Sequence, residues 1–173
     1  MLLVVVTEHI LHITVSSKSV AELLSDELRP YLLALCGGVG GVVGDSTLQW
    51  PLPGHTYISC HFGEVDAFGN AGHCGTDIPA PEGTPILAAH SGTVLVSGWN
   101  DSYGNQVLLD NGAGLSTRYA HMTAPAVTAG ETATAGQVIG YVGSMGDSTG
   151  NHLHFEVMQG GIRVNPLDMV LPN

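Results

Sequence analysis

From Trp50 to the C-terminus the sequence is a series of short apolar runs, broken roughly every 8–12 residues by Gly, Pro, Asn or Asp. This spacing is typical of strands that are joined by tight turns, as in Asn100–Asn105 and Asp110–Gly114. No segment here has the pattern of a crossover helix, which excludes βαβ folds. We therefore expect an all-β domain. The predicted strands are Pro85–Ala89, Thr93–Trp99, Gln106–Asp110, Ser116–Met122, Gln137–Val142 and Leu153–Met158.

The composition changes near residue 36, because all 24 glycines follow it. Residues 1–36 are rich in Leu, Val and Ile, and they contain a strand-like run over residues 10–15. The run Ser19-Val-Ala-Glu22 is typical of a capping box at the start of a short helix. We expect a strand and helix appendage over residues 1–36, which looks like the end of a longer upstream region. A Gly-rich linker over 37–49 and one domain over 50–173 follow.

The charge balance excludes some partners. Fifteen acidic residues against four Lys and Arg give a formal net charge of −11. Such a chain cannot neutralise a row of phosphates, so we expect no nucleic acid partner. No apolar run reaches the ~20 residues of a transmembrane helix, so we expect no membrane insertion. The six apolar residues at the start lack a basic region and a cleavage site, and they do not form a visible signal peptide.

The cysteines leave two alternatives open. There are three of them, at positions 36, 60 and 74. Cys60 and Cys74 could close a short loop, which would contribute ~3 kcal/mol in an oxidising compartment. The alternative is that all three are reduced, partly buried thiols.

Nine histidines against one lysine point to metal binding or proton transfer, and the first candidate motif is His73-Cys-Gly-Thr-Asp77. Residues four apart on an extended strand lie about 13 Å from each other. Two ligands of one metal must lie within a few Å, so the chain has to bend between them. Gly75 is the residue that bends at least cost. The alternative is a surface histidine beside a turn aspartate.

The second motif is His152-Leu-His154. On a strand these two imidazoles share one face, whereas Leu153, Phe155 and Val157 share the apolar one. A separation of about 7 Å favours one ligand beside one imidazole that does not ligate.

The third motif lies on the predicted strand Ser116–Met122. There Tyr119 and His121 share a face. Taken alone, this pattern is more typical of a half-buried structural histidine.

The number of ligands distinguishes the kinds of metal site. His73, Asp77 and His154 supply two nitrogens and one oxygen, and three protein ligands that leave room for water are typical of catalytic zinc. Cys74 adjoins His73, and neighbouring side chains diverge. His121 and His152 remain as imidazoles without a bond to the metal, which suits general acid and base catalysis.

In addition, the stretch from about Trp50 to Asn173 resembles the lysostaphin-type (LytM-type) zinc endopeptidases of bacterial cell walls. The matching motifs are His73-x-Gly-x-Asp77, Tyr119-Ala-His121-Met, Gly136-Gln-Val-Ile-Gly-Tyr-Val-Gly143, Ser148-Thr-Gly-Asn-His152-Leu-His154-Phe-Glu156 and Asn165-Pro. The resemblance implies an antiparallel β-sheet sandwich with an open groove. It also implies one Zn2+ per chain on His73, Asp77 and His154, with His121 and His152 catalytic.

The same resemblance implies a substrate and a location. The substrate would be peptidoglycan, cut in its cross-bridges or stem peptides, at the cell wall or outside the cell. The chain would then be part of a longer wall-binding protein. We expect five residues to contact the peptide: Tyr103, Tyr119, Ser148, Thr149 and Asn151. Glu64-Val65 stands where the family commonly has an Arg, and Asn151 where it often has Pro, which affects the expected substrate preference.

Two other functions compete with this one. Gly146-Asp-Ser-Thr-Gly150 fits the Gly-x-Ser-x-Gly pattern, so a trypsin-like triad of Ser148, His73 and Asp101 is conceivable. It would leave His121, His152 and His154 without a role. The other alternative is a non-catalytic module of the same fold that binds wall peptide or regulates another hydrolase. Such modules typically lack a ligand, whereas here the expected set is complete.

Overall fold

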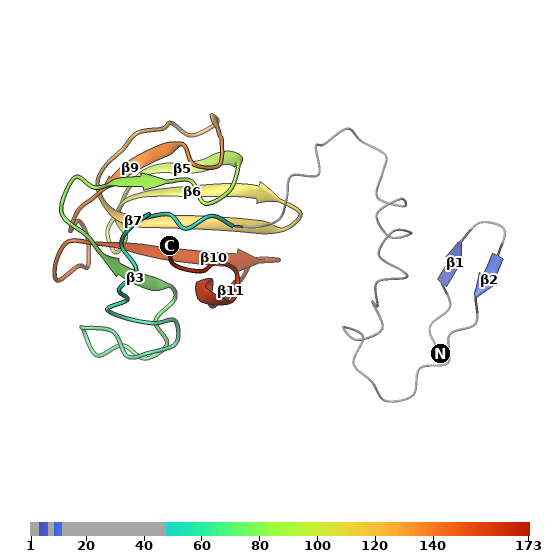
Figure 1. Ribbon diagram of the computed structural model, residues 1–173, viewed down its shortest axis with the longest axis horizontal. Helices are drawn as coiled ribbons and strands as arrows, with labels where there is room; N and C mark the ends of the chain where they lie inside the picture. Colours follow the sequence, from blue (N-terminus) through green and yellow to red (C-terminus); the bar gives the residue numbers. More distant parts are fainter. Residues whose placement is uncertain (1–3, 7–8, 12–47) are drawn as a thin grey trace. The chain divides into compact units, whose positions relative to one another are not determined.

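The computed structural model describes residues 4–6, 9–11 and 48–173 (Figure 1). The chain divides into two compact units, Met1–Gly44 and Asp45–Asn173. In the first unit, β1 (Val4–Val6) pairs antiparallel with β2 (His9–Leu11). The strand predicted over residues 10–15 overlaps β2 at its first two positions. The rest of that strand, the predicted helix after Ser19 and most of the predicted linker lie outside the described residues.

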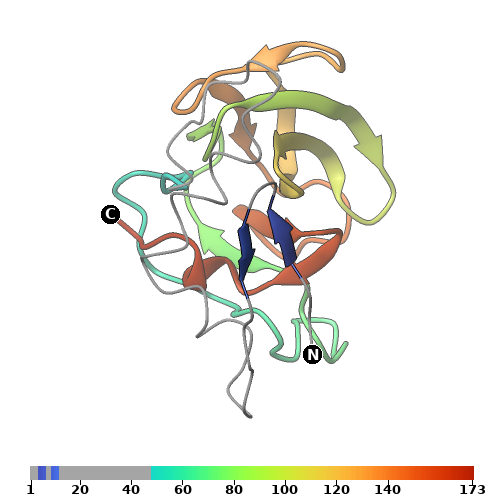
Figure 2. The ribbon, with the colours of Figure 1, turned by 90° about the vertical axis from the view of Figure 1, so that its right-hand side faces the viewer.

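The second unit is built on one antiparallel sheet, so the expected all-β antiparallel fold is confirmed. Its hydrogen-bonded order is β11-β10-β7-β6-β5-β8, while β3 pairs with β10 and β9 pairs with both β4 and β7. Figure 2 shows the strong twist of the long strands. The strands are β3 (Thr76–Pro79), β4 (Pro85–Leu87), β5 (Gly92–Asn100), β6 (Gly104–Gly112), β7 (Leu115–Pro125), β8 (Thr132–Ala133), β9 (Val138–Val142), β10 (His152–Gln159) and β11 (Ile162–Val164).

Helical structure in the described part is a single 3-10 turn, η1 (Pro166–Asp168), in which Asn165 accepts a hydrogen bond from the Leu167 amide. Among the described residues, no helix has the length and apolar character needed to cross a membrane. All six predicted strands are present. Three short strands, β3, β8 and β11, were not predicted, because runs of two to four residues carry too little periodicity.

Strand β10 shows why this sequence forms a sheet with one apolar face. Leu153, Phe155 and Val157 are fully buried and pack in the core, as the alternation predicted. The core also includes Trp50 and Leu52, which lie ahead of the first strand of this unit. Burying each such side chain contributes about 1.5–3 kcal/mol, so the core holds β10 rigidly in place. The opposite face of β10 is thereby free to carry polar side chains.

The register of three strands assembles the polar face. β10 lies between β3 and β7, and His154 stands opposite Asp77 on one side and Ala120 on the other. Directly opposed residues of antiparallel strands project to the same face. Asp77 and His154, which are far apart in the sequence, are therefore held side by side by backbone hydrogen bonds.

Gly75 has a second role beside the one predicted for it. Its backbone is not among those with positive φ, whereas Gly72, just before His73, has φ 81°. A Cβ on Gly75 would lie 2.5 Å from the Phe155 carbonyl oxygen and 3.0 Å from His154 Nε2. The backbone bends at Gly75, between His73 and Asp77, as predicted. Gly75 lets the chain pass close to β10, and Gly72 supplies the left-handed turn.

Candidate functional site

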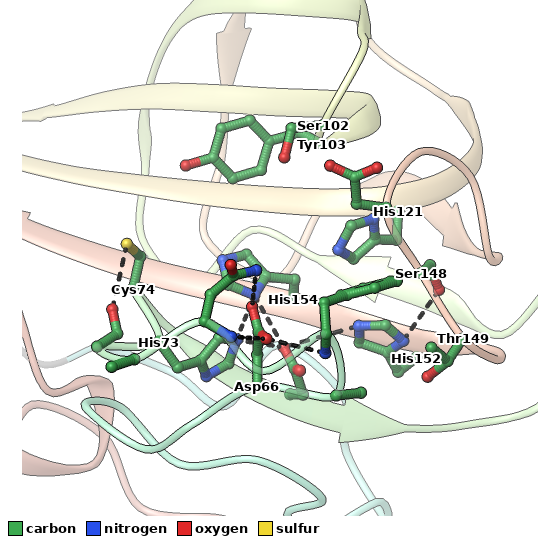
Figure 3. A pocket seen from close by; sticks show the side chains of 17 residues that line it. Asp66, His73, Cys74, Ser102, Tyr103, His121, Ser148, Thr149, His152 and His154 are labelled. Carbon is green, nitrogen blue, oxygen red and sulfur yellow. Dashed lines mark hydrogen bonds and ion pairs between the residues drawn. The ribbon is translucent and has the colours of Figure 1, made fainter.

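Three potential metal ligands converge on one point (Figure 3). His73 Nε2 lies 3.1 Å from His154 Nδ1 and 3.2 Å from Asp77 Oδ1, and His154 Nδ1 lies 2.8 Å from Asp77 Oδ1. Ligands of a tetrahedral zinc with bonds of 2.0–2.1 Å stand about 3.3 Å apart. The side chains are 7–15% exposed. Both the donor types and their spacing fit a zinc ion, so the structure brings together the three residues predicted as ligands.

The carboxylate and the imidazoles of this cluster shift one another's pKa values. Burial alone would raise the pKa of Asp77, but hydrogen bonds from His154 and His73 outweigh it and hold that pKa well below its usual range. Burial would lower the pKa of His154, but its contacts with Asp77 and Glu156 raise it. Asp77 is thus ionised near neutral pH, as a carboxylate that binds a metal must be.

Cys60 is a donor that the sequence did not reveal. It forms an isolated antiparallel bridge with Asp77. Its sulfur, a His73 ring nitrogen and an Asp77 carboxylate oxygen all lie within 4.8 Å of one another. Cys60 and Cys74 are both free thiols, so the disulfide alternative is not observed. No sequence signal could have found Cys60, since its position depends on a long-range strand pairing.

The two imidazoles predicted to be catalytic stand beside the cluster. His121 Nδ1 lies 2.7 Å from the Met145 carbonyl oxygen, and His152 Nδ1 lies 2.8 Å from that of Gly150. A carbonyl only accepts, so each Nδ1 carries a hydrogen, and in the neutral form of either ring Nε2 keeps a lone pair. The ring centroids of His121 and His152 are 4.7 Å apart. His152 Nε2 lies 3.7 Å from Asp77 Oδ1. Both rings can therefore exchange a proton at Nε2.

A β-bulge directs His121 into the site. The register places Asn105 opposite Met122 and Val107 opposite Tyr119, so one residue of β6 faces two of β7. His121 has φ 61°, in the left-handed region that non-glycine residues rarely adopt. The ring consequently turns out of the regular alternation and lines the cavity. Bulges next to active sites commonly redirect a side chain in this way.

Tyr119, predicted to bind substrate, lies in the core instead. It stands opposite Phe155, it is fully buried, and its hydroxyl donates to Thr117 Oγ1 at 3.0 Å. The hydroxyl also accepts from the Ala89 amide at 2.7 Å. The expectation that Tyr119 and His121 share a face fails because the bulge interrupts the alternation between them.

The electrostatics of His121 give a testable expectation. Burial lowers the pKa of this imidazole to about 4, although the hydrogen bond to Met145 acts against the shift. The ring should therefore be neutral at pH 7 and able to accept a proton. Because the folded-state pKa lies below the ordinary value of about 6.5, the stability due to the neutral ring is present above pH ~6.5 and lost toward pH ~4. NMR titration of the metal-free protein should give a midpoint near 4, and a midpoint near 6.5 would contradict this environment.

An open cavity of about 460 Å³ lies over these side chains (Figure 3). Tyr103, Ser148 and Thr149, three of the residues predicted to bind substrate, line it. Asn151 is exposed and does not line it. Other lining residues were not predicted, and they include Asp66, Phe68, Ser102 and Asp147. Their loops meet only in the folded chain.

Glu156 is the functional candidate that sequence reasoning passed over. It is fully buried, and its Oε1 accepts a hydrogen bond from the Tyr103 hydroxyl at 2.7 Å. Two arginines pair with it, Arg163 at 3.2 Å and Arg118 at 3.6 Å. His154 Nε2 lies 3.3 Å from Oε1. The signal was present in the sequence, since Glu156 follows His152 and His154 at the strand period of two.

The serine triad is not formed. Ser148 Oγ donates to the Gly150 carbonyl at 2.9 Å and lies 3.4 Å from His152 Nδ1. The His73 ring is engaged by the His61 carbonyl, Asp77 and His154. Asp101 accepts from the indole of Trp99. The Ser148, His73 and Asp101 side chains are therefore bonded to other groups, and the trypsin-like alternative is wrong.

Two curated bacterial proteins show clear sequence similarity. "DD-carboxypeptidase/endopeptidase Mpg" of Neisseria meningitidis serogroup B is 43% identical over 100 residues, which cover 58% of this chain and 23% of that protein. "Murein hydrolase activator EnvC" of Escherichia coli is 33% identical over 140 residues, covering 81% of this chain and 32% of that one. The chain thus spans about a quarter to a third of the length of these relatives.

Solved structures and a family model agree with them. A zinc-containing peptidase from Vibrio cholerae superposes with TM-score 0.67 and 29% identity, over 73% of this chain and 41% of that one. The lysostaphin catalytic domain of Staphylococcus simulans gives 0.61 and 30%, over 65% and 90%. The model for "Peptidase family M23" matches residues 71–166, which include the three convergent donors and both additional imidazoles. The chain belongs to peptidase family M23.

Proposed function

We propose that this chain is a zinc-dependent endopeptidase that hydrolyses amide bonds in peptidoglycan cross-bridges or stem peptides. The observation that carries the proposal is the convergence of His73, Asp77 and His154 beside two imidazoles whose Nδ1 atoms are bonded to backbone carbonyls. Two further findings support it: the peptidase family of the chain and the naming of one relative as a DD-carboxypeptidase/endopeptidase.

In this proposal His73 Nε2, Asp77 Oδ1 and His154 Nδ1 hold one zinc ion per chain. A zinc ion lowers the pKa of a water molecule and polarises a substrate carbonyl when it is bound in such a site. Asp77 contributes the negative charge of the donor set, and its low pKa keeps that charge across the neutral range. Partial burial of all three side chains limits competition from bulk water for the same position.

His121 and His152 then share two proton transfers. One Nε2 accepts the proton of the attacking water, and the other stabilises the developing oxyanion or gives a proton to the leaving amine. The hydrogen bonds from each Nδ1 to a backbone carbonyl keep both Nε2 atoms available. The neutral state of His121 at pH 7 suits it to accept a proton. Neither task is assigned to one ring alone.

The cavity suits a slim peptide. Ser102, Ser148 and Thr149 line it with small polar side chains, and Tyr103 and Phe68 add aromatic surface. Asp66 and Asp147 also line it, and no lysine or arginine does. We propose that a peptide rich in small residues lies along these side chains with its scissile carbonyl above the three donors.

Location and context follow from the same proposal. The chain would act at the bacterial cell wall or outside the cell, where its substrate lies. Its acidic surface gains no electrostatic attraction from a polyanionic wall, and it covers only a fraction of the relatives it resembles. We therefore propose that it works as part of a longer wall-binding protein.

Purified cell walls provide the test. The zinc-loaded protein is expected to reduce the turbidity of a wall suspension, and a zinc chelator should stop the loss until zinc is restored. A serine-directed reagent should have no effect, because Ser148 is not a nucleophile in this mechanism. Turbidity loss that persists in the chelator, or that the serine reagent abolishes, would overturn the zinc mechanism.

The similarity to a murein hydrolase activator favours one second candidate, a regulator of another hydrolase. In that case the protein alone would release nothing from walls and would increase release by a second enzyme. The complete set of donors and imidazoles favours the enzyme, since a regulator needs none of them.

A further inference from the structure

We infer that Glu156 is a positioning residue which, through Nε2 of His154, aims Nδ1 of that ring at the metal, while Tyr103, Arg118 and Arg163 hold the carboxylate in place. The inference rests on the proposed zinc site and adds a residue to it. None of these four side chains is needed as a ligand.

The His154 ring is held from both ends. Its Nδ1 lies 2.8 Å from Asp77 Oδ1, in the convergent cluster, and its Nε2 lies 3.3 Å from Glu156 Oε1. A neutral imidazole carries one hydrogen, and a metal needs the other nitrogen without one. Of the two ring nitrogens only Nε2 lies within hydrogen-bond distance of Glu156, so this carboxylate favours the form of the ring whose Nδ1 is free to ligate. Carboxylate partners of ligating histidines commonly fix the ring in this way.

The cost of burying Glu156 shows that its position is specifically stabilised. An ionised carboxylate with no exposed surface is strongly unfavourable unless charged and hydrogen-bonding groups surround it. The chain has four Lys and Arg in total, and two of them, Arg118 and Arg163, pair with this one group. Fifteen acidic residues are present, yet both arginines of the second unit (Asp45–Asn173) pair with this one carboxylate. If this strand position served the fold alone, an apolar side chain could occupy it without the desolvation penalty of a buried carboxylate.

The supporting side chains come from three different elements. Arg118 of β7 is the cross-strand partner of Glu156, and its guanidinium lies 4.3 Å from the centre of the Tyr103 ring. Arg163 of β11 donates to the Tyr103 hydroxyl at 3.0 Å. Tyr103 lines the cavity, and its hydroxyl is directed to Glu156. Tyr103, predicted to bind substrate, therefore has a second role as a support for the ring of His154.

The test is Glu156→Gln, which keeps the size of the side chain but removes its charge and offers an amide that can donate to Nε2. Zinc affinity, measured by competition with a chromophoric chelator, is expected to fall about 10–100-fold. In 15N-histidine NMR of the zinc-loaded wild type, the Nε2 hydrogen of His154 should give a slowly exchanging signal. This signal should be lost in the variant. Glu82→Gln, at an exposed carboxylate, is the matched control and should change neither readout.

The outcomes separate this inference from the proposed function. If wild-type protein binds no zinc, the proposed zinc site is wrong. If the wild type binds zinc and Glu156→Gln shows the same affinity and the same Nε2 signal, only the positioning role is wrong. Should Glu156→Gln fail to fold, Arg163→Gln serves instead, because that side chain is 42% exposed. It should weaken zinc binding several-fold, and unchanged affinity together with an unchanged signal would contradict the inference.

Discussion

Asp77→Ala is expected to abolish zinc binding and amide hydrolysis together. Asp77 is the only carboxylate in the convergent cluster, and its Oδ1 lies within 3.2 Å of both imidazole donors. The variant leaves two neutral ligands and removes the negative charge of the carboxylate, which would offset the positive charge of the zinc ion. Since indirect partners of ligands already contribute 10–100-fold to affinity, we expect a loss of more than about 100-fold. Metal content after dialysis and fragment release from walls measure the two effects.

Asp147→Ala is the matched control for metal content. Asp147 lines the same cavity but is exposed and lies on the loop that follows Met145. Its removal should leave the zinc content unchanged. Wild-type zinc content in Asp77→Ala would show that the metal is held elsewhere, and Cys60, which lies in the same cluster, would be the first residue to examine.

His152→Ala is expected to separate metal binding from catalysis. The ring contacts Asp77 at 3.7 Å but is not one of the three donors that lie 2.8–3.2 Å apart. The variant should therefore keep its zinc. Hydrolysis should fall about 10²- to 10⁴-fold, the usual contribution of a positioned proton-transfer group. His55→Ala, outside the cavity, should retain full activity.

Two results would change the division of labour between the histidines. If His152→Ala keeps the wild-type rate of hydrolysis, the ring takes no part in proton transfer. If the variant loses its zinc, His152 belongs to the ligand set.

The part of the site that lies on one strand was predictable. Along β10 the alternation of His152 and His154 with Leu153, Phe155 and Val157 shows which side chains enter the core. A strand has a fixed period of two, and the apolar residues at alternate positions show which face packs in the core. The all-β fold was predictable for the same reason, because turn residues separate each apolar run.

Deviations from the regular strand were not predictable. The bulge at His121 depends on an extra residue relative to β6, which no local pattern reveals, and it reversed the expected orientation of Tyr119. The bend at Gly75 was predicted, but the nearness of the Phe155 carbonyl, which leaves no room for a Cβ there, was not. Both features arise from contacts between segments far apart in the sequence.

The polar surroundings of the ligands also depend on long-range register. Arg118 and Glu156 face each other only because β7 and β10 pair as they do, and Arg163 joins them from β11. The sequence alone showed an acidic chain with few basic residues. The structure shows that the two arginines of the second unit both pair with Glu156.

The most direct test of the central claim is mass spectrometry of wall fragments released in water enriched in 18O. The zinc-loaded protein should release peptides with new amino and carboxyl ends, with one 18O atom in each new carboxyl group. The metal-free protein should release none. Fragments with new sugar ends, or the same peptides released without zinc, would contradict a zinc-dependent endopeptidase built on His73, Asp77 and His154.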